Sequence, residues 1–197
     1  MSRFIESLAH SHGCYPLLDY HQQRVNETFE RFFPDVRRPV QLKEILPVLS
    51  EAHLLKVRVE YGQDSYEVTH TPYSRNYPKS IQVVSTDSFD YQFKYADRSR
   101  LNQLYEQRGS ADDILIAVND QLTDSSYANI CLWKDGQWFT PSTYLLNGVM
   151  RQSLLDKGVI LEVPINISDL EQFEFISLIN ALNEPGDIVI PVHQIVL

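Results

Sequence analysis

The pattern of hydrophobic and polar positions predicts strands and two helices at the start of the chain. Residues 3–18 read as two short strands joined at His12 and Gly13. Residues 19–34 (DYHQQRVNETFERFFP) repeat apolar side chains at helical spacing up to Pro34, which predicts an amphipathic helix. A second helix is expected over residues 40–53, where Pro47 would kink or shorten it.

Strict alternation of apolar and polar residues then predicts a β-hairpin. Residues 54–62 (LLKVRVEYG) and 64–73 (DSYEVTHTPY) alternate on either side of a turn at Gly62 and Gln63. The segment PYSRNYP that follows holds two prolines and few apolar residues, which is typical of a linker. We therefore predict a small N-terminal α/β subdomain, a linker and a larger C-terminal subdomain, at residues 1–72, 73–77 and 78–197.

The rest of the chain mixes strand and helix patterns, which favours an α/β fold. Helices are expected at residues 97–109 and 148–158, each ended by a glycine, and residues 122–128 read as a turn. Ser168 and Glu171 stand at the spacing of a helix capping box. Short strands are expected at residues 80–84, 113–119, 128–133, 137–141, 173–180 and 187–197.

Composition describes an ordinary globular protein. Of the 197 residues, 43% are hydrophobic and 22% charged, and the net charge of −9 comes without any basic run, so we expect no nucleic-acid partner. No apolar run approaches the length of a membrane span, and the opening residues lack the apolar core of a signal peptide. With two cysteines far apart in sequence, Cys14 and Cys131, a cytoplasmic location is the simplest expectation.

Common catalytic and metal-binding motifs are absent from the sequence. It contains no Gly-rich dinucleotide fingerprint, no Walker loop, no His-Glu-x-x-His and no cysteine pair at zinc spacing. His10, His12 and His21 lie near one another, but no carboxylate or thiol completes a ligand spacing. We interpret them as surface or strand-end histidines and expect no metal.

Four short motifs stand out by their order, and a fifth follows near the C-terminus. They are YHQQR with Arg24, FKYADR with Lys94 after an expected aromatic-rich strand, LTDSSYAN with Asp124, LLNGVMR at residues 145–151, and LINAL at residues 178–182. In this order they resemble the pyridoxal-phosphate enzymes of fold type IV. That group holds the class IV aminotransferases, among them branched-chain and D-amino acid aminotransferases, and 4-amino-4-deoxychorismate lyase. The resemblance implies an α/β fold of two subdomains, with pyridoxal 5′-phosphate (PLP) in the cleft between them.

The resemblance also implies a role for each matched residue. Lys94 corresponds to the lysine that holds the cofactor as a Schiff base, and Arg24 to the arginine that binds its phosphate. Asp124 stands where the family usually has Glu beside the pyridine nitrogen. Val149 and Met150 correspond to two family positions whose backbone amides bind the phosphate. Asn180 and Ala181 correspond to a second phosphate-side loop, and Glu6 to an acidic residue on a strand that faces the site.

These implied roles agree with the chemistry of the side chains. A phosphate binds a guanidinium and free N–H groups at a helix N-terminus, which Arg24 and the turn at Gly148 would supply. A lysine nucleophile needs a lowered pKa, which a buried site near a cationic ring would provide. A carboxylate keeps a pyridine nitrogen protonated, and this nitrogen is the partner that we expect for Asp124.

Taken singly, each residue also has an ordinary structural explanation. Alone, Lys94 is better explained as a solvated strand-end lysine and Arg24 as a surface arginine, and Asp124 is also explained as a turn cap. The joint order of the motifs therefore carries the cofactor hypothesis. For a substrate carboxylate the candidate partners are Arg75 and Arg98. The alternative is that Arg98 pairs with an acidic neighbour while Arg75 stays in water.

The sequence departs from the family at two site positions. Asp124 is one methylene shorter than Glu, and Met150 replaces a common Thr and so removes a hydroxyl donor. The chain is also shorter than most relatives, which leaves the substrate open. The resemblance implies a homodimer that transfers an amino group between an amino acid and a 2-oxo acid. The alternatives are a lyase that releases pyruvate and 4-aminobenzoate from 4-amino-4-deoxychorismate, and a non-catalytic binding protein.

Overall fold

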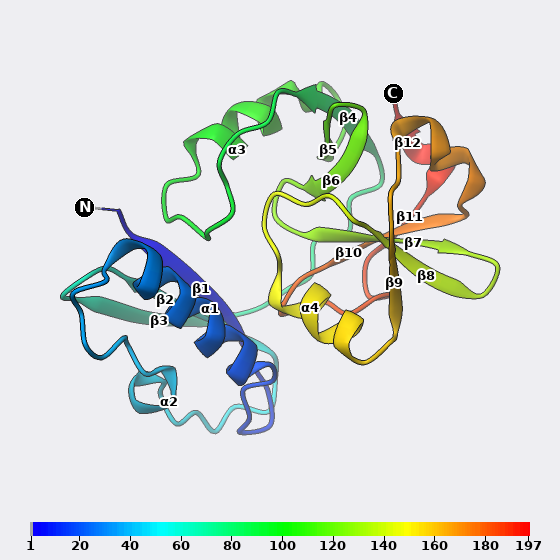
Figure 1. Ribbon diagram of the computed structural model, residues 1–197. Coiled ribbons are helices and arrows are strands. Elements are labelled where there is room, and N and C mark those ends of the chain that lie inside the picture. The colour runs from blue at the N-terminus through cyan, green and yellow to red at the C-terminus, as the bar shows by residue number, and fades with distance from the viewer. Residues whose placement is uncertain (1) are drawn as a thin grey trace. The chain divides into compact units, whose positions relative to one another are not determined.

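The computed structural model describes residues 2–197 and consists of two compact units (Figure 1). The first unit takes the residues up to Ser74 together with Phe93–Asp97, and the second takes Arg75–Gln92 and Arg98–Leu197. The segment that carries Lys94 therefore returns to the first unit. None of the helices in the described part of the chain has the length and apolar character of a membrane span. The division into domains at residues 73–77 stays a prediction.

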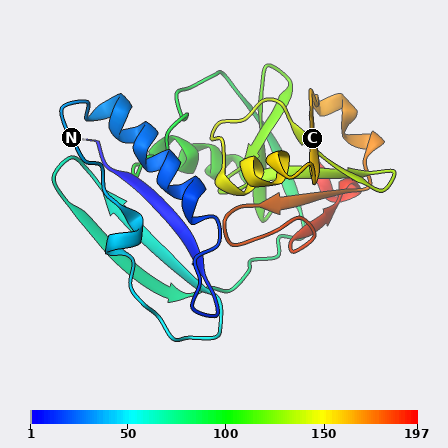
Figure 2. The same ribbon diagram turned by 60° about the horizontal axis from the view of Figure 1, so that its bottom comes forward.

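The first unit is a three-stranded antiparallel sheet with a helix along one face. Its strands lie in the order β1 (Phe4–His10), β2 (Leu55–Tyr61) and β3 (Tyr66–Pro72), and helix α1 (Leu18–Phe32) runs along β1 (Figures 1 and 2). Every second residue of β2 is buried, which confirms the predicted alternation. The core under α1 joins aromatic and aliphatic side chains of the helix and of strands β1 and β2: Phe4, Leu8, Val25, Phe29, Val57, Val59 and Tyr61.

Two predictions for the first unit are wrong in part. Among the described residues, no second strand precedes α1, because Ser11 and Cys14 close a tight turn in which His12 and Gly13 have positive φ angles. The second helix, α2, covers only Leu42–Ile45. Pro47 explains the early end, since the residue before a proline is pushed out of the helical region, and Leu46 has ψ of 135°.

The segment before Lys94 is not the strand that its aromatic residues suggest. Between β4 and helix α3 the described backbone makes only a single bridge, from Tyr95 to Phe4 of β1. The Ile5 amide donates to the Lys94 carbonyl at 2.9 Å, and the Ala96 amide donates to the Arg3 carbonyl at 2.8 Å. The aromatic residues instead fill the first core, where Phe93 packs on Phe32 and Tyr95 on Phe4.

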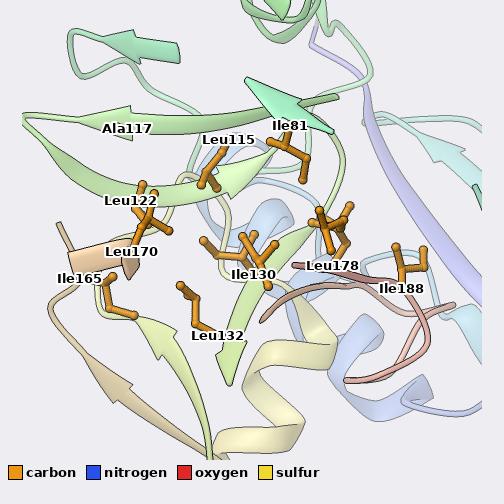
Figure 3. Packing of buried hydrophobic residues seen from close by; sticks show 13 residues of the cluster. Ile81, Leu115, Ala117, Leu122, Ile130, Leu132, Ile165, Leu170, Leu178 and Ile188 are labelled. Atoms are coloured by element: carbon orange, nitrogen blue, oxygen red, sulfur yellow. The ribbon is translucent and has the colours of Figure 1, made fainter. Parts of the chain in front are cut away.

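The second unit is built on a nine-stranded mixed sheet with the path order β11-β10-β7-β6-β5-β4-β12. Off this path, β8 pairs with β7, and β9 pairs with β8. Its strands are β4 (Ile81–Thr86), β5 (Asp113–Val118), β6 (Gln121–Ser125), β7 (Asn129–Lys134), β8 (Gln137–Pro141), β9 (Ile160–Val163), β10 (Phe175–Ile179), β11 (Val189–Pro191) and β12 (Ile195–Val196). Its helices are α3 (Ser99–Tyr105), α4 (Val149–Asp156) and the short 3-10 helices η1 (Glu106–Arg108), η2 (Ile167–Gln172) and η3 (Val192–Gln194). Leu115, Ile130 and Leu178 lie in the centre of its core (Figure 3).

Most of the predicted elements of this unit are confirmed, and the exceptions have local causes. Residues 121–125 form strand β6 rather than a turn, because Leu122 is buried in the core and Asp124 pairs with Asn129 of β7. The capping box of η2 is made by Asn166 and Asp169 instead of the predicted pair. Strand β9 was missed, and the C-terminal segment is split into β11, η3 and β12.

Candidate functional site

Three ionisable side chains are buried together between β1 and α1 in the first unit. Arg24 donates to Glu6 through Nε at 2.9 Å and Nη2 at 2.5 Å, so the pair is bidentate. The Nδ1 atom of His21 lies 2.5 Å from Oε2 of the same carboxylate. His21 and Arg24 reach Glu6 together because residues three apart share one face of a helix. Arg24 is thus a buried arginine and not a surface one.

The electrostatics of this cluster keep Glu6 ionised and His21 neutral. Burial raises the pKa of the Glu6 carboxyl, but the charge of Arg24 and the hydrogen bond from His21 outweigh it and bring the pKa to about 2. Burial lowers the pKa of His21, Glu6 opposes this, and the charges of Arg24 and Lys94 lower it further. A neutral imidazole that donates from Nδ1 presents Nε2 as an acceptor, and this buried Nε2 has no hydrogen-bond partner among the described residues.

The first unit therefore brings together three of the sequence-predicted residues, Glu6, Arg24 and Lys94. The Lys94 backbone is fixed against β1, and its charge acts on His21. Glu6 is fully buried, and both of its oxygens accept bonds from within the protein. In Arg24, Nε and Nη2 serve Glu6, so Nη1 is the guanidinium nitrogen that makes no bond to that carboxylate.

Asp124 is a second buried carboxylate, in the second unit, and only 6% of it is exposed. Its Oδ1 accepts a hydrogen bond from the Asn129 side-chain amide, and its Oδ2 accepts one from the Leu145 backbone amide. Burial raises its pKa to about 7, although these bonds and the charge of Arg151 act in the other direction. A carboxylate in such surroundings becomes a stable anion when a cation lies beside it.

Helix α4 begins next to this carboxylate. Its N-cap is Gly148, and no side chain caps the first turn, which opens with Val149 and Met150. Gly148 has an ordinary φ of −71°, so the glycine is required by space: a Cβ atom would lie 2.0 Å from Oδ1 of Asn129. The free amides and the positive end of the helix dipole are suited to an anion.

The turn that the sequence predicts as a second phosphate-side loop starts at the same end of the sheet. Asn129 pairs with Asp124 on one side and with Ile179 of β10 on the other, so the turn after β10 begins beside β7. Asn180 and Asn183 close this turn by mutual backbone bonds of 3.1 and 3.0 Å, and the Asn180 side chain accepts from the Leu182 amide at 2.9 Å. Half-buried Ala181 lies between them.

The two candidate substrate arginines both have protein partners in the second unit. Arg75 donates from Nη2 to the Asp187 carboxylate at 2.8 Å, and its buried Nε has no partner among the described residues. Arg98 donates from Nη2 to the carbonyl of Ser126 at 2.7 Å, two residues after Asp124. Arg75 is thus ion-paired rather than solvated, and the Nη2 hydrogen bond of Arg98 goes to a carbonyl rather than to an acid.

Comparison with known proteins identifies the family. The family model of class IV amino-transferases matches residues 3–195, nearly the whole chain. The chain belongs to the class IV aminotransferases. It is therefore an enzyme of this type, and it has the mixed α/β fold of fold-type IV enzymes that the sequence predicts.

Three relatives show the range of this class IV family. An uncharacterized protein of Haemophilus influenzae is 31% identical over 188 residues, which cover 93% of this chain and 99% of that protein. A crystal structure from Haemophilus somnus, described as a candidate 4-amino-4-deoxychorismate lyase, is also 31% identical, covers 93% of this chain and 97% of its own, and has a TM-score of 0.87. A hypothetical Mycobacterium tuberculosis aminotransferase in PLP-bound form is 17% identical, covers 98% and 81%, and shares the fold with a TM-score of 0.74.

Sequence reasoning missed three residues that contribute to these two buried clusters. His21 was interpreted as a surface or strand-end histidine, but it is fully buried on α1 against Glu6. The spacing of three residues between His21 and Arg24, which puts both on one face of the helix, is the sequence signal that could have indicated this. Asn129 and Arg151 were left without a role, although both are buried. Asn129 donates to the Leu146 carbonyl in the loop before α4, and Arg151 donates to the carbonyl of Pro141 at the end of β8. Their partners are 10 to 17 residues away in the chain, which no local pattern indicates.

Proposed function

We propose that the chain is a PLP-dependent enzyme that acts at the Cα of an amino-acid-like substrate and transfers its amino group to a 2-oxo acid. The observation that carries this proposal is the buried carboxylate of Asp124, with its raised pKa, bonded to the loop that leads into the uncapped N-terminus of α4. A buried acid in need of a cation, next to a helix end in need of an anion, matches a protonated pyridine ring that carries a phosphate.

The residues of each unit fit the chemical groups of PLP. Asp124 suits the ring nitrogen, and the amides of Val149 and Met150 and the turn at Asn180 and Ala181 suit the phosphate. In the first unit, Arg24 keeps Nη1 for a phosphate oxygen while Glu6 fixes the rest of its guanidinium. The amine of Lys94 is the group that attaches to an aldehyde.

These residues divide the proton and charge movements of the reaction among them. Bound PLP supplies the electron sink that accepts the electron pair of the Cα–H bond. Lys94 Nζ takes the Cα proton as general base and returns a proton in the second half of the reaction. Asp124 remains an anion throughout and holds a proton on the ring nitrogen. Arg75 and Arg98 remain the candidates for the substrate carboxylate.

A lyase reaction is the second candidate function. It is favoured by the Haemophilus somnus protein, described as a candidate 4-amino-4-deoxychorismate lyase, with which this chain is 31% identical over 93% of its length. The same residues would serve it, because release of pyruvate from 4-amino-4-deoxychorismate starts with the same loss of the Cα proton. A chain that only binds PLP is the lesser alternative.

We also infer the setting in which the enzyme works. A cytoplasmic homodimer is the arrangement that the family resemblance and the cysteine usage favour, and both cysteines are free thiols, with Cys14 exposed and Cys131 buried. Light scattering on the purified chain tests the dimer. A mass of 22.9 kDa at all concentrations would contradict it.

A half-reaction screen tests the proposed function. The purified chain is loaded with PLP and mixed with single amino acids or with 4-amino-4-deoxychorismate, while the cofactor spectrum and pyruvate release are followed. Amino transfer predicts that an amino acid bleaches the cofactor absorbance and that a 2-oxo acid restores it. Pyruvate release from 4-amino-4-deoxychorismate alone identifies the lyase. No spectral response to any of these substrates would leave only a binding protein and would refute the proposal.

A further inference from the structure

Asn129, the first residue of β7, contacts two separate segments of the second unit with one carboxamide, strand β6 and the loop that leads into α4. Its Nδ2 atom donates one hydrogen to Oδ1 of Asp124 on β6 and the other to the carbonyl of Leu146 at 2.8 Å. Its Oδ1 atom occupies the space in which a side chain at position 148 would have to lie. The residue is buried, with only 6% of it exposed.

The loop between β8 and α4 is thereby tied to Asp124 in two directions. The Leu145 amide donates to Asp124 Oδ2, and the next residue, Leu146, accepts from the amide that also holds Asp124 Oδ1. Two residues later the chain passes Asn129 so closely that only glycine fits. A shift of Asn129 would therefore move the carboxylate and the start of α4 together.

We propose that Asn129 is a positioning residue that couples the Asp124 carboxylate to the N-terminus of helix α4. The inference rests on the proposed function, in which Asp124 serves the ring nitrogen of PLP and α4 serves its phosphate. The distance between these two groups is fixed in the cofactor, so the protein must hold their partners at one spacing. Asn129 holds this spacing because its side chain contacts both Asp124 and the loop that leads into α4.

An asparagine is the residue type that this position requires. A single nitrogen must donate to two acceptors, a carboxylate and a carbonyl, and only a side-chain amide of this length provides two N–H groups beside an oxygen. The other groups around Asp124 cannot replace it. Arg151 on α4 acts on Asp124 from a distance and pairs with Glu162 of β9.

A titration of the cofactor-free full chain tests the coupling without any assumption about activity. The chain is labelled with ¹³C-aspartate, and the Asp124 signal is assigned with Asp124→Asn. In the wild type we expect a midpoint near pH 7, as burial of the carboxyl sets its pKa at about 7. Asn129→Ala should raise the midpoint by about one unit or more, because the anion loses a donor.

Thr123→Val is the matched control for this titration. It removes the neighbouring buried hydroxyl that donates to the Ile116 carbonyl, and it should leave the midpoint unchanged.

Asn129→Asp is the second variant, for the case in which truncation unfolds the chain. The substitution keeps the size of the side chain but places a second carboxyl group against the carboxyl group of Asp124. The two carboxyl groups should therefore titrate in two separated steps, one below and one above the wild-type midpoint. An Asp124 midpoint within about 0.3 unit of wild type in the Asn129 variants would overturn the proposal and leave Asn129 a packing residue.

A double-mutant cycle on PLP binding tests the link to α4. Gly148→Ala should raise the Kd for PLP by about tenfold or more, because the new Cβ atom at position 148 would clash with Asn129 Oδ1. In the Asn129→Ala background the same change should raise the Kd for PLP less than about threefold, since the clash is gone. Equal effects in both backgrounds would overturn the coupling. A wild-type chain that does not bind PLP would refute the proposed function instead, and the titration would still decide the role of Asn129.

Discussion

Glu6 and Asp124 are both buried carboxylates, and their neighbours give them opposite properties. Glu6 has a cation beside it and a pKa of about 2, whereas Asp124 has only neutral donors in contact and a pKa of about 7. A structural ion pair is satisfied within the protein, while an unpaired buried acid points to a missing ligand. This contrast separates the residue that orients Arg24 from the one that we propose to face the cofactor.

Replacement of Asp124 tests that separation. Asp124→Asn keeps the size of the side chain but removes the charge that would hold a proton on the ring nitrogen. We expect kcat to fall on the order of 10²-fold with little change in KM, since the loss affects proton abstraction and not substrate binding. Asp124→Glu should be milder because it keeps the charge. An Asn variant as fast as the wild type in single-turnover measurements would remove Asp124 from the active site.

Replacement of Glu6 should change the stability of the fold in acid. Because its folded pKa of about 2 lies below the ordinary value of 4.5, the ion pair stabilises the wild type fully above about pH 5 and loses this contribution as the pH falls toward 2. The shift corresponds to about 3 kcal/mol. Urea unfolding between pH 3 and pH 6 should therefore show a steeper loss in the wild type than in Glu6→Gln.

Glu44→Gln is the matched control for that experiment. Glu44 also pairs with an arginine, Arg38, but both side chains are largely exposed, so the variant should keep the pH dependence of the wild type. If Glu6→Gln loses stability with acid as steeply as the wild type does, the buried ion pair is not the cause.

The residues that carry charge could be chosen from sequence only through their order in the chain. Lys94, Arg24 and Asp124 each have a common structural explanation, and the family order decided between the two. What each one touches could not be predicted: Glu6 meets Arg24 across 18 residues, and Asp124 meets Leu145 across 21. Such pairings depend on how strands and helices pack, which a local pattern does not encode.

At the scale of elements, the predictions held where one periodicity dominates. Helix α1 and strand β2 follow their apolar spacing closely, and the β2–β3 hairpin forms as predicted, although β3 is almost wholly exposed. Strand β6 was missed because its polar residues Thr123, Asp124 and Ser125 look like a turn, although the fold buries all three. The segment before Lys94 was misjudged for the opposite reason, since its aromatic residues pack into a core without forming a strand.

The crossing from β8 through α4 to β9 depends on one buried arginine. Arg151, 2% exposed in its side chain, donates to the carbonyl of Pro141 at 2.9 Å and pairs with Glu162, whose side chain is 44% exposed. Arg151→Ala should lower the unfolding free energy by about 3 kcal/mol, because it leaves a buried carbonyl unpaired and a cavity. Glu162→Ala should cost less than about 1 kcal/mol, since water reaches this acid. Equal losses in denaturant unfolding would show that the ion pair, and not the anchoring of Pro141, supports the crossing.

At the scale of the whole molecule, the two units divide the candidate chemistry. The first unit holds Lys94 with the Glu6, His21 and Arg24 cluster, and the second holds Asp124 with the start of α4. The fold class and the family follow from the sequence and are confirmed. The return of Phe93–Asp97 to the first unit was not predicted, because it depends on single bonds to β1 that leave no trace in the residue pattern.

Attachment of the cofactor at Lys94 is the central claim, and covalent labelling tests it most directly. The chain is loaded with PLP, reduced with borohydride, digested and mapped by mass spectrometry. The account predicts a single phosphopyridoxyl group on Lys94, and no label in a Lys94→Ala variant whose circular dichroism matches the wild type. Lys134→Ala removes a half-buried lysine whose amine donates to the side chain of Gln172, and this variant should be labelled like the wild type. A label on another lysine, or none after PLP loading, would contradict the account.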